Sequence, residues 1–164
     1  MEVSHIIWSG WAPGKCRFFL WTAALGKTPT ADHLQRRGWA NNYFCALCFR
    51  NLETPTHLLV ECPWARCIWD QIAIQAGMQH LQLANWPAFG NLKEWMSICS
   101  HNAPKEKKKG TISMIHLVAW EIWKERNRRV FQQREMTTTQ LIRIVREEIN
   151  LWNLAGAKIP FDPG

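Results

Sequence analysis

Four residues of the types that bind transition metals follow one another at short intervals: Cys45, Cys48, His57 and Cys62. The spacing Cys-x2-Cys-x8-His-x4-Cys places two thiols in one tight turn, with an imidazole and a third thiol shortly afterwards. Three thiolates and one imidazole are a standard set for a tetrahedral structural Zn²⁺ site, which leaves no position for a reacting water. The sequence therefore predicts a Zn²⁺ cofactor that stabilises the fold and performs no hydrolysis.

The spacing of His57 and Cys62 constrains the local backbone. On a regular α-helix, residues five apart point about 140° away from each other and cannot share a metal. Thr54 and Pro55 are typical of an N-cap and a first helical position, and Pro63 disfavours a helical conformation at Cys62. We therefore expect a short helix that ends by Cys62, which lets this residue turn back toward the other ligands.

Two alternatives to this ligand set stay open. The four residues could be unrelated buried side chains, although their spacing agrees well with zinc sites. Cys67 could replace Cys62, although its place between Trp64 and Trp69 favours a packed apolar role.

Six cysteines and an N-terminus without the features of a signal peptide predict an intracellular protein, nuclear or cytoplasmic and not secreted.

Proline, glycine and apolar periodicity predict a mainly α fold: a small zinc-stabilised helical domain with a CCHC knuckle and two longer C-terminal helices. The expected helices cover residues 14–25, 30–37, 64–75, 92–99, 112–131 and 138–154. Thr137 and Gln140 fit a capping box before the last helix. Residues 101–110 contain Pro104 and four lysines, which predict a solvated linker. The expected division is 1–76 for the zinc-binding domain, 77–110 for a connecting segment and 111–164 for a two-helix region.

Charge and composition indicate the class of partner. The 164 residues carry a net charge of +7 and include eleven Trp. Most of the excess is in residues 104–134, where nine Lys and Arg face three Asp and Glu. Such basicity favours nucleic acid first, and no apolar run is long enough for a membrane span, so we expect no membrane partner.

Nine basic residues are candidates for phosphate contacts, in three groups: Arg36, Arg37 and Arg50; Lys107, Lys108 and Lys109; and Arg126, Arg128 and Arg129. The alternative for the last two groups is a solvated basic face, which also suits a helix C-terminus. Aromatic residues beside the zinc loop could stack on bases or form the packing shell of the metal site: Trp39, Tyr43 and Phe44.

Several separated motifs surround the cluster in a fixed order: Trp8, Trp11, Pro13, Lys15, Arg17 to Trp21, Thr30, Leu34, Arg37, Gly38, Glu53, Thr54, Leu58, Leu59 and Trp69. Together with the cysteines and histidine they resemble the zinc-binding domain that follows the reverse transcriptase in plant LINE-type (non-LTR) retrotransposons, over about residues 5–76. Residues 119–131 and 152–156 are similar to the tail that often trails this domain. The resemblance implies ligation by Cys45, Cys48, His57 and Cys62, and association with RNA or DNA.

These observations favour a non-catalytic zinc-binding protein, derived from a retroelement, that associates with RNA or DNA through a basic surface. No polymerase carboxylate motif, nucleophile elbow or phosphate-binding glycine loop occurs in the sequence, so an enzyme is not expected. The alternative is a protein-interaction or regulatory module, in genetic conflict or signalling, that binds a partner or a second copy through its C-terminal helices and their tryptophans: Trp120, Trp123 and Trp152.

Overall fold

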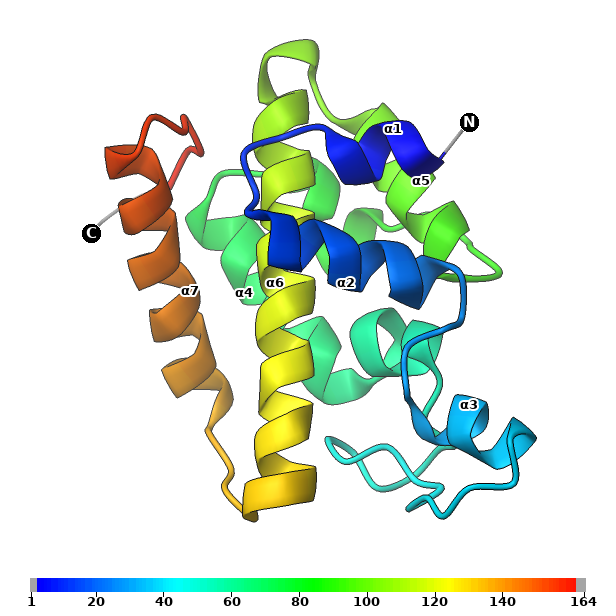
Figure 1. The fold of residues 1–164 in the computed structure, drawn as a ribbon. Coiled ribbons are helices and arrows are strands. Elements are labelled where there is room, and N and C mark those ends of the chain that lie inside the picture. The colour runs from blue at the N-terminus through cyan, green and yellow to red at the C-terminus, as the bar shows by residue number, and fades with distance from the viewer. Residues whose placement is uncertain (1–2, 162–164) are drawn as a thin grey trace.

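The protein is described over residues 3–161 by a computed structural model that is built from helices (Figure 1). The α-helices are α1 (Val3–Trp8), α2 (Gly14–Ala24), α3 (Ala31–Arg36), α4 (Pro63–Gln75), α5 (Leu92–Asn102), α6 (Lys108–Asn127) and α7 (Thr138–Leu154). Short π-helical turns are η1 (His57–Glu61) and η5 (Arg128–Gln132), and short 3-10 turns are η2 (Gln79–Leu81), η3 (Leu83–Asn85) and η4 (Lys105–Lys107). The mainly α prediction is confirmed.

Helix α6 is the centre of the molecule. It contacts α1, α2, α4, α5 and α7, and Figure 1 shows α2 crossing it on one side while α7 runs along another. All residues from Gly110 to Ala119 are buried, because neighbours surround the helix on every side. Two of its buried polar side chains are hydrogen-bonded to distant segments: His116 Nε2 lies 2.9 Å from the Ile7 carbonyl oxygen, and Thr111 Oγ1 lies 2.7 Å from His80 Nε2. The sequence predicted only a one-sided apolar stripe here.

One hydrophobic core joins the three segments that the sequence distinguishes. Leu20 of α2, Trp95 of α5 and Ile122 of α6 belong to the same buried cluster. The rings of Phe19 and Trp123 stack 5.2 Å apart and fix α2 on α6. Trp120, Trp123 and Trp152 are partly buried and pack against this cluster. They therefore do not form the exposed protein-binding surface that the interaction-module alternative requires.

Most of the expected helices are present, with boundaries that differ by at most three residues. Helices α2, α3, α4, α5 and α7 correspond to the expected helices over residues 14–25, 30–37, 64–75, 92–99 and 138–154. Gly38 and Gly77 follow α3 and α4 with φ of 72° and 65°, as expected for left-handed residues after a helix C-terminus. Local capping signals therefore determine these helix ends.

The region expected to be a solvated linker is mostly helical. Residues 105–107 form η4 and α6 already begins at Lys108, so the prediction for residues 101–110 is wrong in secondary structure. Gly110 is buried and its Cα lies against Pro160, where an added Cβ would come within 3.3 Å of the proline ring. This contact with the C-terminal segment anchors the start of α6, and no local sequence pattern reports it. Helix α1, with buried Ile6 and Ile7, was not predicted either.

The capping box of α7 provides a direct test of local stability. Thr137 Oγ1 accepts a hydrogen bond from Gln140 N at 3.1 Å, and Gln140 Oε1 accepts one from Thr137 N at 2.9 Å. We expect Thr137→Ala to lower the free energy of unfolding by about 1 kcal/mol in urea denaturation. The neighbouring exposed Thr139 caps nothing, so Thr139→Ala is the matched control. Equal unfolding midpoints for the two variants would contradict the role of the cap.

Candidate metal centre

The first two candidate ligands lie in a tight turn closed by backbone hydrogen bonds. Cys45 N donates to the Asn51 carbonyl at 2.8 Å, and Phe49 N donates to the Cys45 carbonyl at 2.8 Å. An isolated antiparallel bridge between Phe44 and Leu52 holds the base of the turn together. Leu47 N points at Cys45 Sγ at 3.4 Å, which places a partial positive charge beside the sulfur.

The other two candidate ligands are brought together by a widened helical turn. Thr54 Oγ1 accepts a hydrogen bond from His57 N at 2.9 Å, as expected for an N-cap. From His57 to Glu61 the backbone is π-helical, and Cys62 N donates to the His57 carbonyl at 2.7 Å. Cys62 then adopts an extended conformation (φ −63°, ψ 131°) before Pro63. The expected helix end is therefore observed, and the π turn supplies the wider spacing that a regular helix lacks.

The four side chains converge on one point. One ligand atom from each of Cys45, Cys48, His57 and Cys62 can be chosen so that all lie within 4.8 Å of one another. The sulfurs of Cys45 and Cys62 are 3.9 Å apart, and Cys48 Sγ is 3.3 Å from His57 Nε2. In a tetrahedral zinc site with Zn–S bonds of about 2.3 Å, neighbouring ligand atoms lie roughly 3.5–3.8 Å apart. The donor chemistry and the separations therefore fit a tetrahedral metal ion.

The proton affinities of these groups reflect their proximity. A hydrogen bond to the Cys62 sulfur, followed by burial, raises the pKa of Cys45 to about 12. The same hydrogen bond lowers the pKa of Cys62, and the backbone N–H groups of Trp64 and Ala65 at the start of α4 lower it further. A hydrogen bond to Cys45 raises the pKa of His57 to about 9 against the opposing effect of burial. Metal binding at such a site displaces protons that the ligands otherwise share.

Comparison with known families now bears on this site. Residues 1–69 match a family described as zinc-binding in reverse transcriptase. This confirms the resemblance to reverse-transcriptase zinc-binding domains over these residues, and all four candidate ligands lie within the matched segment. Residues 70–164 lie outside it. No curated protein and no solved structure matches the chain.

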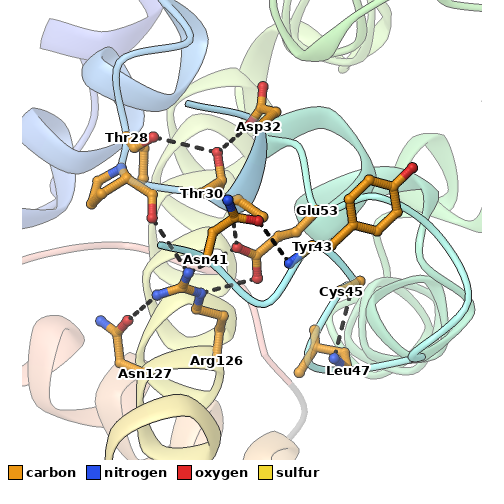
Figure 2. A network of polar contacts seen from close by, with 12 residues as sticks. Thr28, Thr30, Asp32, Asn41, Tyr43, Cys45, Leu47, Glu53, Arg126 and Asn127 are labelled. Carbon is orange, nitrogen blue, oxygen red and sulfur yellow. Dashed lines mark hydrogen bonds and ion pairs between the residues drawn. The ribbon is translucent and has the colours of Figure 1, made fainter. Parts of the chain in front are cut away.

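A buried ion pair connects the zinc-binding segment to the helical remainder. Arg126 of α6 donates from Nε and Nη2 to the two carboxylate oxygens of Glu53, at 3.0 and 2.8 Å (Figure 2). Glu53 also accepts from Ala31 N at 3.0 Å, and Arg126 donates to the Pro29 carbonyl and to Asn127 Oδ1. Both charged side chains are almost fully buried. The pair therefore fastens α6 to the start of α3 and to the strand-like segment before the π turn.

A second carboxylate secures the metal-binding turn itself. Glu125 accepts from Arg128 Nε at 2.9 Å, from Arg129 Nε at 2.8 Å and from Met136 N at 2.9 Å. Arg129 also donates from Nη1 to the Ala46 carbonyl at 3.1 Å, between the two cysteines of the turn. The end of α6 and the metal-binding turn are thus held as one unit.

These contacts correct the expectation for Arg126, Arg128 and Arg129. The sequence predicted an exposed basic surface, whereas in the structure Arg126 pairs with Glu53, and Arg128 and Arg129 share Glu125. The Arg126 and Arg129 side chains are buried, and Arg128 is partly exposed. A phosphate would have to displace these carboxylates. Arg126 and Arg129 therefore position the metal-binding segment, through their contacts with Glu53 and with the Ala46 carbonyl.

The other candidate basic residues form two separate groups. Lys107 donates to the Gly77 carbonyl at 3.0 Å, and the Lys109 ammonium lies 4.5 Å from the centre of the Trp11 ring. With Lys108 they lie at the start of α6, about 30 Å along this 20-residue helix from the arginine cluster at its other end. The exposed residues Arg36, Arg37 and Arg50 lie instead near or within the loop that carries the metal ligands.

Four aromatic side chains on this loop are exposed. The exposed fractions are 57% for Trp39, 44% for Tyr43, 50% for Phe44 and 64% for Phe49. The Tyr43 and Phe44 rings meet edge to face at 4.8 Å, and the Arg37 guanidinium lies 5.5 Å from the Trp39 ring. A packing shell for the metal site would be buried, so these four exposed rings do not form such a shell. Phe49 was not among the aromatic residues predicted beside the zinc loop. The only feature of the sequence that could have indicated it is its position directly after Cys48.

Proposed function

We propose that this protein is a non-catalytic zinc protein of retroelement origin, and that its zinc loop binds single-stranded RNA or DNA. Zn²⁺ is held by Cys45, Cys48, His57 and Cys62, and its role is to fix the loop. The family description of residues 1–69 and the convergence of three sulfurs with one nitrogen support the choice of metal. None of the six cysteines forms a disulfide, which suits a reducing intracellular location, in nucleus or cytoplasm.

The exposed aromatic residues of the zinc loop carry the proposal for nucleic acid. Proteins that bind single strands without sequence preference combine stacking platforms with a basic groove that follows the backbone. Trp39, Tyr43, Phe44 and Phe49 provide such platforms here, and Arg36, Arg37 and Arg50 provide charge for phosphates. The lysines at the start of α6 lie too far away to share the same few nucleotides.

Fluorescence anisotropy with a labelled twelve-nucleotide RNA or DNA strand tests this proposal. We expect Trp39→Ala to weaken binding by about 1–3 kcal/mol, the usual contribution of one stacked base. The wild-type affinity should also fall steeply as salt is raised, since phosphate contacts release counterions. Phe18→Ala is the matched control, because Phe18 is also an exposed aromatic residue (60%) but lies on α2. Equal affinity of the Trp39 and Phe18 variants would overturn the proposed surface.

A protein-interaction module remains a second candidate because one side of α2 is exposed and apolar. Phe18, Trp21 and Leu25 are exposed at helical spacing, and the rings of Phe18 and Trp21 lie 6.1 Å apart. This candidate predicts an association with one protein, or with a second copy of the chain, that is insensitive to salt. Phe18→Ala would then weaken the association, and Trp39→Ala would leave it unchanged.

A further inference from the structure

A hollow of about 520 Å³ opens beside the zinc loop. One wall comes from the segment that precedes the metal-binding turn, including Asn41, Asn42 and Phe44. The opposite wall comes from the end of α6 and η5, including Trp123, Asn127 and Phe131. Its volume is in the usual range for small-ligand sites, about 300–1,000 Å³.

The charges in this hollow exclude an anion as its preferred ligand. Arg126 is the cation that lines it, and its guanidinium is engaged by both carboxylate oxygens of Glu53. Figure 2 shows Asn127 beside this pair, with its Oδ1 accepting from Arg126 Nη1 at 3.1 Å. The Nδ2 group of Asn127 is left as a donor, and Asn42 adds a second side-chain amide to the lining. The third, that of Asn41, is already bonded to the Trp39 carbonyl and to Tyr43 N. The hollow therefore offers aromatic walls and amide groups around a neutral floor.

Those features suit a flat, neutral ring with hydrogen-bonding edges. Phe44 belongs both to the exposed aromatic surface and to the hollow, so the two are continuous. A strand that stacks on Tyr43 and Phe44 would pass the mouth of the hollow. We propose that the hollow receives one unstacked nucleobase of the bound single strand, between Phe44 and the end of α6. This inference rests on the proposed function and adds a site to it.

Free nucleosides, which lack phosphate, separate this inference from the stacking surface. In ¹H–¹⁵N spectra of the zinc-loaded protein, we expect adenosine, guanosine, cytidine or uridine at millimolar concentration to shift the Asn127 side-chain amide and the Trp123 indole. The shifts should be insensitive to salt, because no phosphate is involved. The variant Val130→Trp fills the hollow and should abolish them. N-acetyltryptophanamide, an aromatic compound that lacks the hydrogen-bonding edge of a nucleobase, is the control ligand.

Oligonucleotide binding gives the second readout. We expect Val130→Trp to weaken binding of the twelve-nucleotide strand roughly 5- to 100-fold with an unchanged salt slope. Phe131→Ala removes an exposed ring that forms part of the wall, and should also weaken strand binding. It serves as a second variant in case Val130→Trp disturbs folding. Trp39→Ala should weaken strand binding and leave the nucleoside shifts intact. Circular dichroism and zinc content check each variant.

The outcomes distinguish the two levels of the proposal. Strand binding that is unaffected by Val130→Trp and Phe131→Ala, with no nucleoside shifts, overturns the nucleobase pocket and leaves the stacking surface standing. Shifts caused by N-acetyltryptophanamide and not by nucleosides also overturn the pocket, because its ligand would then be a peptide side chain. Failure of the wild-type protein to bind any strand overturns both.

Discussion

Cys45→Ser is expected to abolish zinc binding and to remove most of the protein's stability. The Cys45 side chain is fully buried and its sulfur lies 3.9 Å from that of Cys62, so its replacement removes one of the four converging groups. Structural zinc sites contribute roughly 10–16 kcal/mol of binding free energy, which is comparable to the whole stability of a domain, about 5–15 kcal/mol. Zinc content by mass spectrometry and thermal unfolding followed by circular dichroism measure the two effects.

Cys67→Ser is the matched control for this experiment. Cys67 is exposed on α4 and lies outside the converging group, so its replacement removes a thiol without removing a ligand. It should bind one zinc and unfold at the wild-type temperature. Zinc loss in the Cys67 variant, with retention in a Cys62→Ser variant, would show that the ligand set includes Cys67 in place of Cys62.

Glu53→Ala is expected to destabilise the protein by about 3–5 kcal/mol, although Glu53 is not a ligand. The substitution leaves the buried Arg126 guanidinium without its carboxylate and also removes the acceptor for Ala31 N. Breaking a buried pair on one side is costly because an uncompensated charge stays in the interior. Urea unfolding of the zinc-loaded protein measures the loss.

Two variants show whether this effect belongs to the buried pair. Arg36→Ala breaks the exposed ion pair between Arg36 and Asp32 and should cost less than about 1 kcal/mol. The double variant Glu53→Leu with Arg126→Met removes both charges and should recover much of the stability that Glu53→Ala loses. An equal cost for the Arg36 and Glu53 variants would contradict the anchoring role of the pair.

The role of Arg126 also affects how binding experiments are designed. Charge reversal at Arg126, Arg128 or Arg129 breaks contacts to Glu53 or Glu125 and should loosen the metal-binding turn. A loss of nucleic-acid binding in those variants would therefore reflect folding. Substitutions at the exposed residues Arg37 and Arg50 are the appropriate probes of phosphate contact.

The convergence of Cys45, Cys48, His57 and Cys62 could be predicted from the sequence because its determinants are local. Cys45 and Cys48 share one turn, Thr54 caps the next helix, and Pro63 ends it at Cys62. The π-helical form of His57–Glu61 could not be predicted, because nothing in its composition distinguishes it from an α-turn. The capping box at Thr137 was equally local and is observed.

Two of the errors concern residues whose environment depends on distant parts of the chain, and one concerns a local contact. Arg126 meets Glu53 from 73 positions away, so a count of charges along α6 cannot reveal that it is neutralised. Glu125, in contrast, is three and four residues from Arg128 and Arg129, and that spacing alone predicts ion pairs on a helix. In the lysine-rich region, Gly110 packs on Pro160 of the C-terminal segment, a contact that charge and proline content cannot report.

Across residues 3–161, none of the helices combines the length and the hydropathy that crossing a bilayer requires. The N-terminal segment and the C-terminal helices share one core, and the contacts of Glu53, Glu125 and their arginines fasten the metal-binding loop to it. This arrangement leaves the aromatic residues of the loop exposed on a supported scaffold. In the proposed complex, a loop held in this way would lose little conformational entropy when it binds a strand.

X-ray absorption at the zinc edge, with metal content measured on the same sample, tests the central claim most directly. The protein should be purified without chelator. The structure predicts one zinc per chain, with three sulfur neighbours at about 2.3 Å and one nitrogen neighbour at about 2.0 Å. Zinc well below one per chain, or a coordination shell of oxygen atoms, would contradict the assignment of Cys45, Cys48, His57 and Cys62 as the site.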